Sequence, residues 1–262
     1  MQNIIKALNY QTKRDNVTYY SILAGILFLV MGASEVNGFL NQTGSEYFIN
    51  MFSYTLGVVV VFVILATRIC GWDYTDKTMN YEILIGHSRR DVYWSRVWVA
   101  FIWCVPIVLI ISIVPPLVLS LINGWGVNMD LGGLILRFTI SIFPMIRIFC
   151  ECVLITFLTK NCYLGLIVSF LYEEIGFSIL TGFEEIGKIE IGNFRVLHAF
   201  ANYQHLLTFA DYNYKWIDGE DVMLFETAVD PLYAWLSVGV SIAGSILCLV
   251  LGWLYFKKSD MK

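Results

Sequence analysis

Six apolar runs, each long enough to cross a lipid bilayer, constrain the fold more than any other feature of this sequence. A membrane-spanning helix needs about 20 mostly apolar residues. The runs that meet this length are residues 19–40, 50–70, 97–122, 131–158, 162–183 and 232–256. Within a bilayer, a helix satisfies its own backbone hydrogen bonds. The sequence therefore predicts an all-α integral membrane protein with six transmembrane helices in a single domain, residues 1–262.

The composition agrees with lipid as the main solvent of this chain. It is 58% hydrophobic and only 15% charged, whereas an ordinary soluble domain is about 45–50% apolar and about 25% charged. Such a chain has too little polar surface to cover itself in water. The net charge of −4 argues against a nucleic-acid partner, because such a partner calls for a basic face.

The flanks of the runs predict which side of the membrane each loop occupies, because cytoplasmic loops carry an excess of Lys and Arg. If the N-terminus lies inside, the inner side carries Lys6, Lys13, Arg14, Lys77, Arg89, Arg90, Arg96, Lys160, Lys257, Lys258 and Lys262. The outer side then carries only Lys188, Arg195 and Lys215. This asymmetry predicts a multi-pass protein with both termini in the cytoplasm.

Two segments outside the runs have a distinct character. Residues 1–18 mix apolar and basic side chains, which favours a helix lying on the inner membrane surface; a disordered tail is the alternative. Residues 184–231 form the one long external segment, where acidic residues outnumber basic ones and apolar residues recur. We expect this segment to be a partly helical cap that attracts cationic ligands; a merely solvated acidic surface is the alternative.

Four charged residues inside the runs are candidates for a transport pathway. Arg147 and Glu151 are four residues apart, so they share one face of a helix. Glu173 and Glu174 fall near the middle of the fifth run. Charges at that depth usually face a bundle interior or an aqueous cavity. The alternatives are a solvated surface bridge for the first pair and an irregular re-entrant segment for the second.

The sequence offers no convincing catalytic or metal site. Residues 182–188 have the spacing of a phosphate-binding loop, but Ile189 stands where the magnesium-binding hydroxyl belongs. The histidines His87, His198 and His205 lack metal-ligand spacing. The six cysteines lie in or beside apolar runs, which favours free thiols. We therefore expect no enzymatic activity, no metal and no cofactor in this chain.

The polar segment between the second and third runs, residues 71–96, is more elaborate than a simple connection requires. It is amphipathic, breaks at Gly86 and resumes as a basic stretch that enters the third run. Together with Ile69 and Cys70, it resembles the first cytoplasmic loop of ABC-2-type permeases, the membrane subunits of bacterial ABC exporters. Thr78, Ser88, Arg89, Tyr93 and Arg96 fit that pattern, and Lys77 departs from it because glycine is usual there.

The resemblance implies a six-helix, type V exporter-like permease in the bacterial plasma membrane, with a coupling helix inside residues 71–96. It implies two cytoplasmic ABC ATPase subunits as partners, and a second permease subunit that is identical or related. ATP and magnesium would bind to the ATPase subunits. The candidate coupling residues are Tyr74, Asp76, Lys77, Thr78, Tyr81, Glu82, Ile83, Leu84, Ser88, Arg89 and Arg90.

Two functional hypotheses remain at this point. The first is an exporter permease that moves an amphipathic or cationic peptide, such as an antimicrobial peptide, in export or immunity. The second is a stand-alone membrane sensor or immunity protein that binds an external peptide without an ATPase. The first predicts that an ATPase co-purifies with the chain, and the second predicts that the chain purifies alone.

Overall fold

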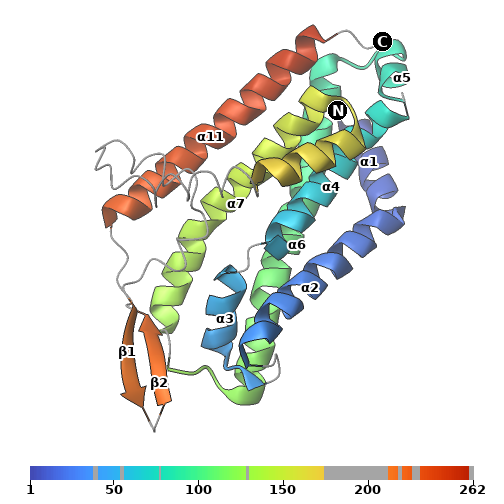
Figure 1. Cartoon of the computed structure of the whole chain (residues 1–262). Helices are drawn as coiled ribbons and strands as arrows, with labels where there is room; N and C mark the ends of the chain where they lie inside the picture. Colours follow the sequence, from blue (N-terminus) through green and yellow to red (C-terminus); the bar gives the residue numbers. More distant parts are fainter. Residues whose placement is uncertain are drawn as a thin grey trace.

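The fold, seen in a computed structural model, is a bundle of long helices (Figure 1). The structure describes residues 1–37, 41–53, 56–76, 78–127, 130–173, 212–217, 220–225 and 231–259. The helices are α1 (Gln2–Arg14), α2 (Asn16–Asn37), α3 (Gly44–Ser53), α4 (Leu56–Thr75), α5 (Met79–Leu84), α6 (Arg89–Asn123), α7 (Leu131–Thr159) and α11 (Pro231–Lys258). A further apolar helix covers Cys162–Glu173.

Three of the described helices are long and apolar enough to cross a membrane. They are α6, α7 and the part of α11 from Ala234 to Lys258. Shorter apolar helices cover Asn16–Leu27 and Cys162–Glu173. These findings confirm a helical, multi-pass membrane protein.

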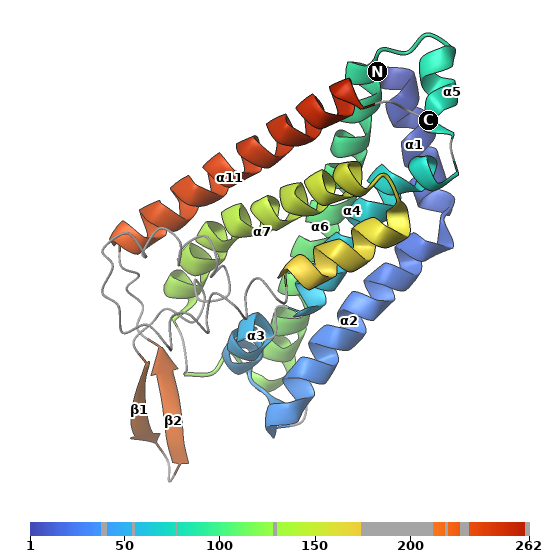
Figure 2. The same cartoon turned by 45° about the horizontal axis from the view of Figure 1, so that its top comes forward.

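The two ends of the bundle differ in what they carry. The N-terminus, the C-terminus, α1 and α5 lie together at one end in both views (Figures 1 and 2). The strands β1 (Tyr212–Ile217) and β2 (Glu220–Phe225) lie toward the other end. α4 occupies the centre of the bundle, where it contacts α2, α6 and α7. The chain therefore brings its first helix, its last residues and the segment predicted to couple to a partner to one end.

α4 and α7 approach so closely that only glycine fits at the contact. A Cβ atom on Gly71 of α4 would lie 2.7 Å from Thr156 Cγ2 of α7 and 3.0 Å from Cys162 Cα. Beside it, the backbone N–H of Cys162 donates to Thr75 Oγ1 at 3.0 Å. The end of α4 is thus fixed against the turn that follows α7.

Residues 212–225 depart from the all-α prediction. β1 and β2 pair antiparallel, with Tyr212 opposite Phe225 and Ile217 opposite Glu220. The rest of the segment 184–231, which we expected to be a partly helical cap, lies outside the described residues. The all-α prediction therefore holds for the helical bundle and not for this strand pair.

The cysteines behave as predicted. All six are buried and none forms a disulfide. They pack mostly with aliphatic and aromatic side chains of the core, where a thiol acts as a small apolar group.

Candidate functional site

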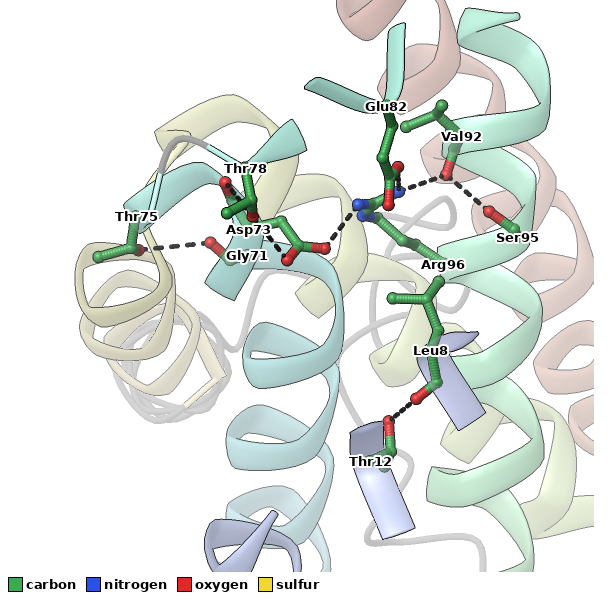
Figure 3. A network of polar contacts seen from close by, with 10 residues as sticks. All are labelled: Leu8, Thr12, Gly71, Asp73, Thr75, Thr78, Glu82, Val92, Ser95 and Arg96. Carbon is green, nitrogen blue, oxygen red and sulfur yellow. Dashed lines mark hydrogen bonds and ion pairs between the residues drawn. The ribbon is translucent and has the colours of Figure 1, made fainter. Parts of the chain in front are cut away.

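The junction of α4, α5 and α6 is organised around one buried arginine. Arg96 lies two turns into α6, and its side chain is fully buried. Its Nη2 atom donates to Asp73 Oδ2 of α4 at 2.5 Å, and its Nη1 atom donates to Glu82 Oε2 of α5 at 2.8 Å. Figure 3 shows the guanidinium between these two carboxylates. One side chain therefore joins three helices.

The burial of the charged Arg96 side chain costs free energy that its partners must offset. A buried guanidinium is costly unless carboxylates and carbonyls satisfy it, and losing one partner leaves an uncompensated charge. Arg96 also donates to the backbone carbonyl of Val92 at 3.2 Å. Asp73 is itself held, because its Oδ1 atom accepts from Thr78 Oγ1 at 3.0 Å. The network thus fixes the path of the chain from α4 into α5.

Ser88 and Gly86 determine where α6 begins. Ser88 is the N-cap of this helix, and its Oγ atom accepts from the backbone N–H of Asp91 at 3.1 Å. A serine cap satisfies one of the backbone donors that a helix leaves free at its N-terminus. Gly86, two residues earlier, has φ = 107°, a conformation that glycine adopts without the strain that a Cβ atom brings. These residues end α5 and begin α6 within a short turn.

α5 is amphipathic despite its six residues. Met79 is buried and Ile83 packs partly against the core. On its outer side, Tyr81 is 64% exposed, and Leu84 and the following Ile85 are each 79% exposed. We call these three residues the α5 patch. It is an apolar surface on a helix that Arg96 holds in place, and this combination suits a docking surface.

α1 lies beside this junction and is attached to it. Its buried residues Ile4, Leu8 and Thr12 are four apart and form one stripe. Asn9 Oδ1 accepts from Trp103 Nε1 of α6 at 2.7 Å. The helix predicted in residues 1–18 is therefore present from Gln2 to Arg14, and it is held against α6.

The residue after α1 carries a second attachment. Asp15 pairs with Arg68 of α4, with 2.6 Å between Oδ2 and Nε. The Arg68 guanidinium also lies over the ring of Trp72, 3.3 Å from its centroid. A cation over an aromatic face is a further attractive contact.

The structure gives several predicted coupling residues internal partners. Tyr74 packs edge-on against Phe157 and Phe256, with ring centroids 6.0 and 6.3 Å apart. Burial raises the pKa of the Tyr74 hydroxyl, so it stays neutral. Arg89 donates to backbone carbonyls at the end of α11. These residues are half-buried and contribute to the junction.

Other predicted coupling residues do lie at the surface. They are Asp76, Thr78, Ser88 and Arg90, together with Tyr81 and Leu84 of the α5 patch. Lys77 lies outside the described residues. The surface open to a partner is therefore smaller than the predicted set, and it is centred on α5.

The charged residues inside the bundle form a second candidate site. Arg147 and Glu151 of α7 pair with 3.3 Å between Nε and Oε1, and their side chains are 3% and 6% exposed. The predicted pairing is confirmed, and burial excludes a solvated surface bridge. Glu173, the last described residue of its helix, lies within hydrogen-bonding reach of Glu151. Glu174 lies outside the described residues.

Two features of the junction were missed by the sequence reasoning. Asp73 and Arg96 both lie in the segment that carries the family resemblance, but their pairing was not predicted. The attachment of α1 through Asp15 was not predicted either. The available signal was weak: a single arginine immediately before an apolar run, with acidic residues 14 and 23 positions earlier.

No metal centre is visible in the part of the chain that the structure describes. Among those residues, no group of three or more His, Cys, Asp or Glu side chains is arranged to hold an ion.

These features define a class: a multi-pass helical membrane protein in which a short, exposed helix is fixed rigidly between two long helices. A family model described as "ABC-2 family transporter protein" matches residues 9–176, and so the chain belongs to the ABC-2 transporter family. The match includes the whole α4–α5–α6 junction. No curated protein matches the chain. Membership implies a membrane component of a transporter that associates with ABC ATPases and is generally not itself catalytic.

Proposed function

We propose that this chain is the permease subunit of an ATP-driven ABC exporter in a bacterial plasma membrane. It crosses the membrane six times, at residues 19–40, 50–70, 97–122, 131–158, 162–183 and 232–256. Both termini and α5 face the cytoplasm, and α1 lies on the inner membrane surface. The excess of Lys and Arg in the flanks supports this orientation.

One observation carries the proposal: the α5 patch is exposed and apolar, and the helix beneath it is anchored by a buried ion network. A docking surface gains affinity when it is already ordered before binding, because little conformational entropy is then lost. Exposed Tyr81 is of a residue type that is enriched among the side chains that anchor interfaces. We propose that α5 sits in a groove of an ABC ATPase subunit.

The complex would contain two such ATPase subunits and a second permease, identical or related. ATP and magnesium bind to the ATPases and not to this chain. Closure of the ATPases pushes α5, and the Arg96 network passes that push to α4 and α6. The membrane halves then change from inward-facing to outward-facing, as a hinge or shear motion does.

We propose a cationic or amphipathic peptide as the substrate, moved in export or in immunity. Two features support this substrate class. The cluster of the buried Arg147 and Glu151 with the half-buried Glu173 holds two carboxyl groups for one guanidinium, and the external segment 184–231 is acidic. Both favour positive charge in a ligand.

The test is co-purification of the chain with its ATPase from the native cell. Leu84→Asp and Tyr81→Asp place a charge on the α5 patch, and each is expected to abolish the association. Val127→Asp is the matched control. Val127 is also apolar and 62% exposed, and it lies beyond the far end of α6. A wild-type chain that purifies alone would instead favour the stand-alone sensor or immunity protein.

A further inference from the structure

The first turns of α6 also bind the last helix of the chain. Arg89 Nη1 donates to the backbone carbonyls of Lys257 at 2.8 Å and Ser259 at 2.9 Å. The last carbonyls of a helix have no partner within that helix, and the partial negative charge there favours a cation. Arg89 therefore caps the C-terminal end of α11.

One turn further along α6, Tyr93 makes a second contact with α11. Its hydroxyl donates to the carbonyl of Leu249 at 2.9 Å. Its ring is fully buried, with centroids 5.7 Å from that of Trp253 and 5.8 Å from that of Phe256. A Cβ atom on Gly252 would lie 2.7 Å from the Tyr93 hydroxyl oxygen. The absence of a side chain at Gly252 thus lets Tyr93 seat against α11.

These contacts place α6 between two sets of partners. Arg96 holds α4 and α5, as described above, while Arg89 and Tyr93 hold α11. All three residues lie within the first eight positions of one continuous helix. A force on α5 would therefore reach α11 through a short, hydrogen-bonded and partly buried path.

We propose that Arg89 and Tyr93 are positioning residues that transmit the movement of α5 to α11, so that the two helices move as one body. This inference rests on the proposed function, because it needs an ATPase that pushes α5. It adds α11 to the moving elements, and α11 lies outside residues 9–176, where the family match ends.

The contact between Tyr93 and α11 also indicates which part of the bundle the transmitted movement would affect. Leu249, the partner of Tyr93, lies in α11. α11 packs along α7, which carries the Arg147–Glu151 pair. Movement of α11 would therefore change the surroundings of this buried pair.

The experiment uses the permease purified with its ATPase and reconstituted in lipid nanodiscs. Spin labels at positions 80 and 258 report the distance between α5 and the end of α11. Asn80 lies on α5 outside the α5 patch, and the six native cysteines are buried. In the wild type, this distance is expected to stay constant between the nucleotide-free and ATP-bound states. In Arg89→Gln and in Gly252→Ala, it is expected to change between the two states.

Each variant has a matched control. Arg14→Gln makes the same chemical change on an exposed arginine at the end of α1, outside the candidate coupling residues. Gly239→Ala makes the same change on α11 at a glycine whose added Cβ meets nothing within 4 Å. Both controls are expected to behave as the wild type. Tyr93→Phe removes only one hydroxyl, so it tests the contact if another variant fails to fold.

The second readout is the amount of transport per ATP hydrolysed. Loss of a hydrogen bond that involves a charged group corresponds to roughly a tenfold change. We expect Arg89→Gln to lower the ratio by about that factor while ATP hydrolysis continues. The inference would be overturned if the distance between the two spin labels in the wild type changed with nucleotide, or if the variants kept the wild-type ratio of transport to ATP hydrolysis. Either result would leave the proposed function standing. If no ATPase associates with the wild type, the proposed function fails, and the inference fails with it.

Discussion

The Arg96 guanidinium lies 2.5 Å from the Asp73 carboxylate, although the two residues are 23 positions apart in the sequence. This contact closes the loop that carries α5, because the loop leaves α4 just after Asp73 and enters α6 before Arg96. A helix of six residues is too short to be stable alone. α5 keeps its place because the residues on either side of it are paired.

We predict that Arg96→Met destabilises the protein by about 3–5 kcal/mol, because Asp73 and Glu82 are left without their counter-charge. Thermal unfolding in detergent measures the effect. Adding Asp73→Asn and Glu82→Gln to Arg96→Met is expected to recover part of the loss. If the triple variant is no more stable than the single one, the ion network is not what stabilises the junction.

Substitutions on α5 should separate folding from docking. Ile83→Asp is expected to lower the free energy of unfolding by about 1–3 kcal/mol, because Ile83 packs against the core. Leu84→Asp should change it by less than about 0.5 kcal/mol, because this side chain is exposed. Equal melting temperatures for the two variants would contradict the structure here.

Gly71→Ala should cost about 1–3 kcal/mol, because the new methyl group overlaps Thr156 Cγ2. Adding Thr156→Ser removes that methyl and keeps the hydroxyl that donates to the carbonyl of Cys152. The double variant should therefore recover part of the lost stability. Full tolerance of Gly71→Ala in the wild-type background would show that α4 and α7 are further apart than described.

The buried pair in α7 gives a test of charge compensation. Arg147→Met alone should destabilise the protein by about 3–5 kcal/mol, because Glu151 is left buried beside a second carboxyl group. Replacing both partners, as in Arg147→Met with Glu151→Leu, should restore most of the stability. Transport of a cationic peptide should remain low in the double variant. Normal transport there would remove this cluster from the pathway.

The lengths of the apolar runs and the composition predicted a helical membrane protein, because lipid imposes a simple rule on every spanning segment. The Arg147–Glu151 pair could also be predicted from the sequence, since its spacing within one helix fixes the geometry. The partners of Arg96 could not be predicted from the sequence, because pairing between helices depends on packing that a single sequence does not encode locally. Tyr74 shows the same limit: an aromatic residue at a helix end suits a surface and a core equally.

The strand pair was a signal that the sequence reasoning overlooked. Tyr212, Tyr214 and Trp216 alternate in the first segment, and Asp218-Gly219 stand between the two segments. An Asp-Gly pair flanked by such runs is a strong hairpin indication. The interpretation of residues 184–231 rested on their acidic charge and did not use this alternation.

The placement of both chain ends has a practical consequence for anyone handling this protein. The ammonium group of Met1 lies 3.9 Å from Asp91, and the carbonyl of Ser259 accepts from Arg89. Affinity tags or fluorescent fusions at either terminus would therefore crowd the face on which an ATPase is expected to dock. A reporter inserted near Val127, beyond the far end of α6, would leave that face clear, and false-negative pull-downs would be avoided.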